Sequence, residues 1–351
     1  MTDPKTIAVT GLNATDNPAP GVGVIRALRA HPDFDGRIVG LAYDSLDPGI
    51  YAKDLVDDVF LVPYPSQGLA AFRARLDEIH TRVPLDVVIP TLDAELPTFI
   101  DLEPELRRQG IGSFLPSKEL FDLRSKANLA HLGELTNINT PATRVLADPS
   151  ELRQLEDELP FPFWVKGAYY GALKVHDVHE AVAAYHQMVA KWGVPVIAQA
   201  SVEGDEVDVV AVGDGRGGMV GAVPMRKRLL TDKGKGWAGI AIRDPEIEEL
   251  SRRYFAATRW RGPCEIEMIR AQSGELHLLE INPRFPAWCY LSAGAGMNLP
   301  WAVAQLAAGQ SVEPMHDYQV GTMFVRISVD QIVQLSDFES IASTGELHRS
   351  T

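Results

Sequence analysis

Four side chains with oxygen ligands fall on two segments that the sequence predicts to pair as a β-hairpin: Glu265, Glu267, Glu280 and Asn282. Side chains alternate between the faces of a strand, so Glu265 and Glu267 share one face, as do Glu280 and Asn282. Clustered carboxylates repel one another without a cation, and oxygen-only ligands suit Mg²⁺, which usually also binds substrate phosphates. The sequence therefore predicts a metal and phosphate site here. The alternative is a solvated acidic edge.

Basic side chains elsewhere in the chain are candidates to meet those phosphates. Lys126 lies in a segment with helical periodicity, and Lys166 ends an apolar strand before a turn of small residues. Such a turn can present backbone N–H groups and an ammonium group to phosphate oxygens. The Walker A pattern is absent. A lysine before an ordinary turn is the alternative.

A third group of cations, Arg226, Lys227 and Arg228, precedes a glycine-containing loop at residues 231–237. A basic strand that leads to a hinged loop suits contact with a terminal phosphate and exclusion of water. Lys227 and Arg228 are both candidates for that contact, and the sequence does not choose between them. A solvated charged hairpin is the alternative.

The elements that must position these residues begin with alternating strands and helices. Strands are predicted at 6–10, 37–42, 60–62 and 85–90, with helices at 22–28 and 68–80 between them. This rhythm predicts a parallel sheet with helices on both faces.

The rest of the chain is richer in strands. Helices are predicted at 117–135, 148–160, 177–192 and 246–257, and strands at 163–165, 194–199, 206–212, 219–223, 265–270 and 275–281. Asp177 is the expected cap of its helix, because its carboxylate can accept from backbone N–H groups of the first turn. The last two strands form the acidic hairpin.

Composition excludes several classes of protein. The 351 residues are 46% hydrophobic and carry a formal charge of −14, which indicates a globular chain of two or three units and disfavours a nucleic-acid binder. Two cysteines, Cys264 and Cys289, are too few for a disulfide framework, so we expect reduced thiols. No apolar run approaches the ~20 residues of a membrane span, and the N-terminus lacks signal-peptide features. We therefore expect a cytoplasmic location and no membrane partner.

The order of these features resembles the ATP-grasp superfamily, most closely its carbamoyl phosphate synthetase-like and D-alanine–D-alanine ligase-like branches. The resemblance covers nearly the whole chain, and its most specific part is Leu-Leu-Glu-Ile-Asn-Pro-Arg at 278–284. It implies an α/β ATP-grasp fold in three parts. These are a Rossmann-like pre-ATP-grasp domain with a parallel sheet at 1–117, linker helices and a small α+β lid at 118–200, and an antiparallel-sheet ATP-binding subdomain at 201–351.

The resemblance also implies cofactors and residue roles. ATP would bind with Mg²⁺, for which Mn²⁺ can substitute. Lys126 and Lys166 match phosphate-binding lysines, and Arg284 matches an arginine that stabilises charge on the acyl phosphate or tetrahedral intermediate. The adenosine positions match Gln199, Ala200, Val202 and Glu206. The metal positions match Glu267, Glu280 and Asn282.

Two positions depart from the pattern of the superfamily. The lid loop after Lys166 is usually rich in glycine and serine, whereas Tyr169 and Tyr170 stand here. Glu265 is acidic where some ligases carry a cation. These departures leave the phosphate contacts of the loop and the identity of the acceptor open.

The function that the resemblance implies is an ATP- and Mg²⁺-dependent carboxylate–amine ligase that works through an acyl phosphate. Its substrates would be a small carboxylate and an amine, with amino acids and peptides as candidates, and its assembly a homodimer. One alternative is a carbamoyl phosphate synthetase-like or other acyl-phosphate-forming enzyme. Another is a nucleotide-binding protein without catalysis.

Two further groups of residues suggest other kinds of site. The glycines of segment 11–23 invite a dinucleotide reading, with Asp44 as the ribose acid, but a long Asn/Asp/Pro loop separates them. His176 and His179 are three residues apart, yet no nearby motif supplies a third zinc ligand. We expect surface histidines and glycines that serve a tight turn.

Overall fold

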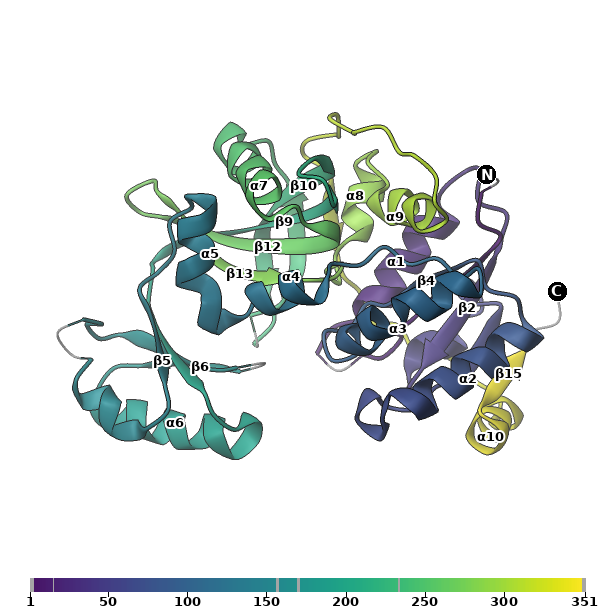
Figure 1. Cartoon of the computed structure of the whole chain (residues 1–351), viewed down its shortest axis with the longest axis horizontal. Helices are drawn as coiled ribbons and strands as arrows, with labels where there is room; N and C mark the ends of the chain where they lie inside the picture. Colours follow the sequence, from purple (N-terminus) through teal and green to yellow (C-terminus); the bar gives the residue numbers. More distant parts are fainter. Residues whose placement is uncertain (1–2, 15, 156–157, 169–170, 233, 349–351) are drawn as a thin grey trace.

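The chain folds around three β-sheets (Figure 1). The computed structural model describes residues 3–14, 16–155, 158–168, 171–232 and 234–348. Within them, the mixed α/β architecture predicted from the sequence is confirmed. No helix in these ranges combines the length and apolarity that a bilayer span requires.

The first sheet has five strands in the order β15-β3-β2-β1-β4. Its parallel strands are β1 (Thr6–Val9), β2 (Arg37–Ala42), β3 (Asp58–Leu61) and β4 (Val87–Ile89). The connections contain α1 (Pro20–Arg29), α2 (Leu69–Arg82) and two 3₁₀ turns, Pro48–Tyr51 and Pro65–Gln67, and α3 (Leu96–Arg108) follows β4. The parallel sheet predicted from the strand–helix rhythm is therefore present.

Alternation along each strand supplies both faces of this sheet. Ile7 and Val9 face α1 and the later helices, whereas Ala8 faces α2 and α3. On the second face Phe72 and Phe99 meet edge to face at 5.2 Å and are fully buried. Burial of each such ring contributes roughly 1.5–3 kcal/mol.

Glycines in the loop after β1 serve close packing of the backbone. Gly11 has a φ of +70°, and a Cβ at Gly21 would lie 1.9 Å from the carbonyl oxygen of Thr10. Only glycine lets α1 begin against the end of β1 in this way. This packing accounts for the glycines without a dinucleotide.

The end of the chain returns to the first sheet, which the sequence did not indicate. Helix α10 (Leu335–Thr344) precedes β15 (Glu346–His348), and β15 pairs antiparallel with β3. Both lie beside the first sheet in Figure 1, drawn in yellow. The predicted subdomain at 201–351 therefore includes a final segment that packs on the first sheet and not on the antiparallel sheet.

A four-stranded antiparallel sheet forms a separate lobe with α6 (Figure 1). Its order is β5-β8-β6-β7, from β5 (Thr143–Leu146), β6 (Phe163–Gly167), β7 (Ala172–Val175) and β8 (Val196–Ala200). Helix α6 (Val178–Trp192) packs its buried side chains on this sheet. As expected, the Asp177 carboxylate caps it and accepts from the backbone N–H groups of His179 and Glu180.

The third sheet has six antiparallel strands in the order β13-β12-β9-β10-β11-β14. They are β9 (Gly204–Asp214), β10 (Met219–Leu230), β11 (Gly236–Ala241), β12 (Arg261–Ala271), β13 (Leu276–Asn282) and β14 (Met323–Val325). One face packs against α5 (Leu129–Thr136) and α7 (Pro245–Thr258). Helices α8 (Tyr290–Gly294) and α9 (Leu299–Ala307) follow β13 and pack in the core shared with the first sheet.

Two predicted helices are shorter than expected. Residues 117–135 form α4 (Lys118–Leu123), a 3₁₀ turn (Lys126–Asn128) and then α5, because Ser125 is extended and breaks the helix. The capping box at Asp148 is present, but it starts only a 3₁₀ turn, Pro149–Arg153. Lys126 is therefore on a turn and not inside a helix.

The returning strand should be held more weakly at high pH. The pKa of His348 is raised above 6.5, first by its hydrogen bond to Asp58 and also by Glu346, against an opposing effect of burial. A raised pKa contributes stability that is complete below pH 6.5 and is lost as pH rises through the raised value. Hydrogen exchange of the β15 amides, corrected for intrinsic rates, should be slower below pH 6.5 than at alkaline pH. The His348→Gln variant should lose this difference; its persistence there would contradict the assignment.

Candidate active site

A cluster of carboxylates lies on one face of the six-stranded sheet. The register pairs Glu265 with Asn282 and Glu267 with Glu280, so the side chains predicted to share a face do so. Glu267 also pairs with Asp208 on β9, which adds a carboxylate that the sequence analysis did not select. Asp208 is 2% exposed. Three neighbouring strands thus bring their acidic residues to one place.

Asn282 bridges two of the carboxylates. Its Nδ2 donates to Glu265 Oε2 at 3.0 Å and to Glu267 Oε1 at 2.6 Å. Burial raises the pKa of Glu265 and of Glu280, and the charge of Glu267 raises each further. These carboxylates repel one another, because they are held close together and away from water. A bound cation would offset this repulsion.

The oxygen ligands suit a divalent ion. Among the described residues, no three His, Cys, Asp or Glu side chains are arranged to hold a metal by themselves. The predicted set of Glu267, Glu280 and Asn282 is different, since it combines two carboxylates with an amide oxygen. Such a partial set, completed by phosphate oxygens, fits Mg²⁺.

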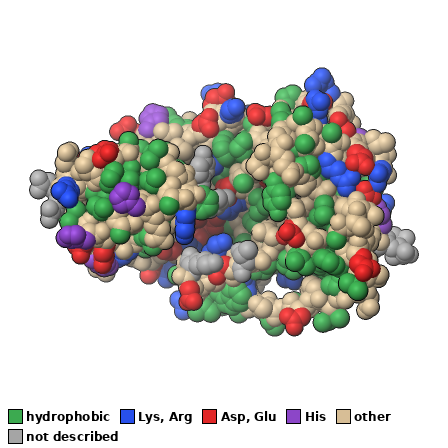
Figure 2. Space-filling model, turned by 90° about the horizontal axis from the view of Figure 1, so that it is seen from below, with side chains coloured by type: hydrophobic (Ala, Val, Ile, Leu, Met, Phe, Trp, Pro, Cys, Tyr) green, Lys and Arg blue, Asp and Glu red, His purple; other side chains and the backbone are tan. Residues whose placement is uncertain are grey.

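Two lysines reach this cluster from outside the sheet. Lys126 Nζ lies 3.2 Å from Glu280 Oε1, which its place on the turn before α5 allows. Lys166, at the end of β6, donates to Gln199 Oε1 at 2.6 Å. Burial lowers the pKa of Lys166, and the charge of Lys126 also lowers it, whereas Glu280, Glu267 and Glu206 oppose the shift. Figure 2 shows acidic and basic side chains at the floor of a hollow beside the lobe with α6.

The predicted adenine positions lie where two sheets connect. Gln199 and Ala200 end β8, and Val202 lies in the short connection to β9. Gln199 is 3% exposed, and its Nε2 donates to Thr143 Oγ1 at 3.3 Å. Since Lys166 already occupies Gln199 Oε1, a nucleotide would exchange this contact for its own.

The structure separates the two candidates on β10. Lys227 Nζ lies 2.7 Å from Glu206 Oε2 and 3.1 Å from Asp208 Oδ2. Burial alone would lower the pKa of Lys227, but the carboxylates of Asp208, Glu267 and Glu206 outweigh it and raise the pKa. Arg228 is exposed. Strand alternation therefore directs Lys227, and not Arg228, to the cluster.

Arg284 joins the cluster to the first sheet. Its Nε donates to Asp93 Oδ2 at 3.0 Å, and its Nη1 donates to Glu265 Oε2 at 3.1 Å. Trp288 Nε1 donates to Glu265 Oε1 at 2.7 Å. Glu265 is therefore a buried acceptor that orients its neighbours. Asp93 was missed by sequence reasoning, although it follows the strand at 85–90, where side chains of a parallel sheet often meet ligands.

The loops at the edge of the cluster also meet. Thr231 Oγ1, just after β10, donates to Asp16 Oδ2 at 2.7 Å, so the glycine-containing loop contacts the loop after β1. Tyr169 and Tyr170, predicted in the lid loop, lie outside the described residues. His179 is 95% exposed, as expected for a surface histidine. Cys264 and Cys289 are both buried and free.

Loss of Lys227 should destabilise the fold. The Lys227→Met variant leaves Asp208 buried without its counter-ion, which costs about 3–5 kcal/mol. Arg228→Met is the matched control and should change stability by less than about 0.5 kcal/mol, because Arg228 is exposed. Chemical denaturation measures both variants, and adding Asp208→Asn to Lys227→Met should recover part of the loss. Equal stability of the two single variants would contradict the buried pair.

Comparison with known proteins agrees with this geometry. Residues 194–329 match the model of a family described as ATP-grasp in the biosynthetic pathway with Ter operon. No curated protein matches the chain. The matched segment contains β9 to β14, and with them Lys227, Arg284 and the acidic hairpin.

Solved structures resemble nearly the whole chain. The biotin carboxylase domain of 2-oxoglutarate carboxylase from Hydrogenobacter thermophilus, in complex with MgADP and bicarbonate, is 15% identical with a TM-score of 0.72, covering 92% of this chain and 74% of that one. L-amino acid ligase from Bacillus licheniformis is 16% identical with a TM-score of 0.66, covering 89% and 76%. N5-carboxyaminoimidazole synthetase from Staphylococcus aureus is 13% identical with a TM-score of 0.65, covering 90% and 80%. Residues 194–329 therefore match an ATP-grasp family, and nearly the whole chain shares the fold of these solved structures.

Proposed function

We propose that the protein is an ATP- and Mg²⁺-dependent carboxylate–amine ligase that forms an amide or peptide bond through an acyl phosphate. The observation that supports this most is the cluster in which Lys126 and Arg284 meet the acidic hairpin and Lys227 meets Asp208 on the neighbouring strand. It combines oxygen ligands for a metal with cations for phosphates on one buried face. A shared fold alone would not argue for a reaction, whereas this arrangement of charges does.

Glu267, Glu280 and Asn282 would hold Mg²⁺. When bound, the ion would neutralise negative charge on the phosphates of ATP. Lys126, Lys166 and Lys227 lie around the same carboxylates and are our candidates for the phosphate contacts. Their ion pairs with the protein would then give way to contacts with phosphate oxygens.

The nucleoside would lie against the connection between the two antiparallel sheets. Gln199, Ala200 and Val202 are our candidates for adenine, and Glu206 for the ribose hydroxyls. Glu206 now accepts from Lys227 at 2.7 Å, so sugar binding and phosphate binding would share this pair.

The reaction would take two steps. A carboxylate oxygen of the first substrate attacks the γ-phosphorus, the bond to the β,γ-bridging oxygen breaks, and ADP leaves. The nitrogen of the amine then attacks the acyl carbon, inorganic phosphate leaves, and the nitrogen loses a proton. Arg284, which Asp93 and Glu265 hold in place, would stabilise the charge that develops on the acyl oxygens. Arg228 is the alternative candidate for the contact with the γ-phosphate, beside the loop at residues 231–237.

A cavity beside the cluster has the size of a site for a small organic substrate. Its volume is about 750 Å³, within the range of ~300–1,000 Å³ typical of small-molecule sites. Trp288, which hydrogen-bonds Glu265, lines it.

A carbamoyl phosphate synthetase-like or other acyl-phosphate-forming reaction is the second candidate function, and a non-catalytic nucleotide-binding protein is the third. The three-part domain division, the homodimer and the cytoplasmic location remain proposals.

Release of phosphate tests the proposal directly. The protein is incubated with ATP, Mg²⁺ and pooled small carboxylates and amines, and products are identified by mass spectrometry. We expect release that needs both a carboxylate and an amine, with a product lighter than their sum by one water. Release that needs a carboxylate but no amine would favour the second candidate. ATP binding without release from any pool would favour the third.

The hairpin offers a matched pair of variants for the same assay. Glu280→Gln should lower turnover by at least about 100-fold with folding intact, because it removes a metal ligand and the partner of Lys126. Glu275→Gln lies on the same hairpin, 65% exposed, and should retain full turnover. Full turnover of Glu280→Gln would refute the metal assignment.

A further inference from the structure

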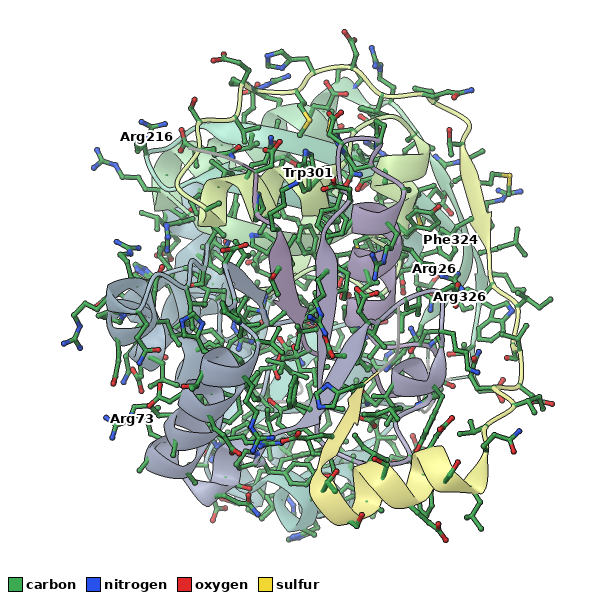
Figure 3. All side chains as sticks on the ribbon, turned by 90° about the vertical axis from the view of Figure 1, so that its right-hand side faces the viewer. Arg26, Arg73, Arg216, Trp301, Phe324 and Arg326 are labelled. Carbon is green, nitrogen blue, oxygen red and sulfur yellow. The ribbon has the colours of Figure 1, made fainter. Side chains whose placement is uncertain are left out.

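The cavity of about 750 Å³ lies between the first sheet and the strand at the edge of the third. Its walls come from the loop after β1, from α1, and from β14 with the residues that follow it. Arg26 on α1, Phe324 on β14 and Arg326 just after β14 all line it. Figure 3 shows these three side chains beside one another.

Neither arginine has an acidic partner. Among the side chains that the structure describes, no carboxylate lies within ion-pair distance of Arg26 or Arg326, and the buried Nε of Arg326 has no hydrogen-bond partner. The Arg326 guanidinium lies over the Phe324 ring at 5.5 Å. Arg326 is half-buried, and burial lowers the pKa of its guanidinium against the opposing effects of Cys289 and of Glu265, which lies beyond ion-pair distance.

The chain carries a formal charge of −14, so its carboxylates outnumber its cations. Cations of the proposed reaction centre are paired, Lys227 with Asp208 and Arg284 with Asp93, whereas no described carboxylate pairs with the two arginines of the cavity. A half-buried guanidinium without a counter-ion loses hydration that only an anion can replace. Arg326 is such a group, and Arg26, which is exposed, lines the same cavity. Together the two guanidinium groups are suited to a bound anion, because a planar guanidinium fits a carboxylate or a phosphate in bidentate fashion.

The other residues that line the cavity indicate the chemistry of the rest of the ligand. Val22, Leu55, Trp237 and Trp288 give the cavity an apolar side. Of its two carboxylates, Asp16 accepts from Thr231, and Asp54 is exposed. Trp288 also donates to Glu265, and Arg284 donates to the same carboxylate. Glu265 therefore connects this wall of the cavity to the proposed reaction centre.

We propose that this cavity binds the amine substrate, and that the substrate carries a carboxylate or phosphate group held by Arg26 and Arg326. The inference rests on the proposed ligase function and specifies its acceptor. The anionic end lies at the two arginines, the apolar body along the tryptophans, and the amine points towards Arg284. An amino acid or a short peptide with a free carboxylate has this chemistry.

The test is a titration of small anions into the protein saturated with Mg²⁺ and a non-hydrolysable ATP analogue, so that the contacts to all three nucleotide phosphates are already filled. The probes are succinate, inorganic phosphate and the neutral succinamide, followed by calorimetry at low ionic strength. We expect one of the two anions to bind and succinamide not to bind. The anion that binds identifies the group as a carboxylate or a phosphate.

Variants locate the binding. Arg326→Gln and Arg26→Gln should each weaken anion binding about tenfold or more, because each removes a charge-assisted contact. Arg326→Lys, which keeps the charge, should retain part of the affinity. Arg216→Gln is the matched control, since Arg216 is 87% exposed and far from the cavity in Figure 3, and it should bind as the unaltered protein does. Melting temperatures check that every variant folds.

The outcomes separate this inference from the proposed function. Anion binding that both cavity arginines support, and Arg216 does not, establishes the site. Absence of binding, or affinity unchanged in Arg26→Gln and Arg326→Gln, overturns it. Failure of the ATP analogue to bind with Mg²⁺ would overturn the proposed function instead, and the anion titration is repeated without nucleotide to judge the cavity by itself.

Discussion

The placement of like charges in a buried cluster is the constraint on which the rest of the structure depends. Antiparallel pairing of three strands brings carboxylates together from Glu206, Asp208, Glu265, Glu267 and Glu280. Their mutual repulsion must be offset locally, because burial makes it stronger than it would be in water. Each cation that offsets it arrives from a different element: Lys126 from a turn, Lys227 from β10 and Arg284 from the segment after β13.

The same opposite charges also connect the three sheets. Arg284 joins Asp93 of the first sheet to Glu265 of the third, and Lys166 brings the four-stranded lobe towards Glu280. A nucleotide with its metal would replace several of these ion pairs at once. Binding would then change the contacts between sheets as well as those within the cluster, which suits a site that must close around a reactive intermediate.

The local features were predictable from the sequence, and the non-local ones were not. Strand alternation predicted that Glu267 and Asn282 would meet their partners across the hairpin, and the cap at Asp177 follows from a single turn. The role of Asp93 depends on a contact 191 residues away in the chain, for which no short pattern exists.

Three other features of the structure were also not predictable from local sequence patterns. The break at Ser125, which leaves Lys126 outside a helix, was not visible in the hydrophobic periodicity, because apolar residues of α4 and α5 pack in the same core. The preference for Lys227 over Arg228 needed the strand register, which the sequence left open. The pairing of β15 with β3 joins segments from opposite ends of the chain.

The central claim is that a substrate carboxylate is activated as an acyl phosphate, and transfer of an oxygen atom tests it most directly. The carboxylate substrate is labelled with ¹⁸O, and the inorganic phosphate formed with ATP and the amine is analysed by mass spectrometry. The account predicts one ¹⁸O atom in each phosphate released, because the carboxylate oxygen that attacks the γ-phosphorus leaves with it. Product formation with unlabelled phosphate would contradict the account.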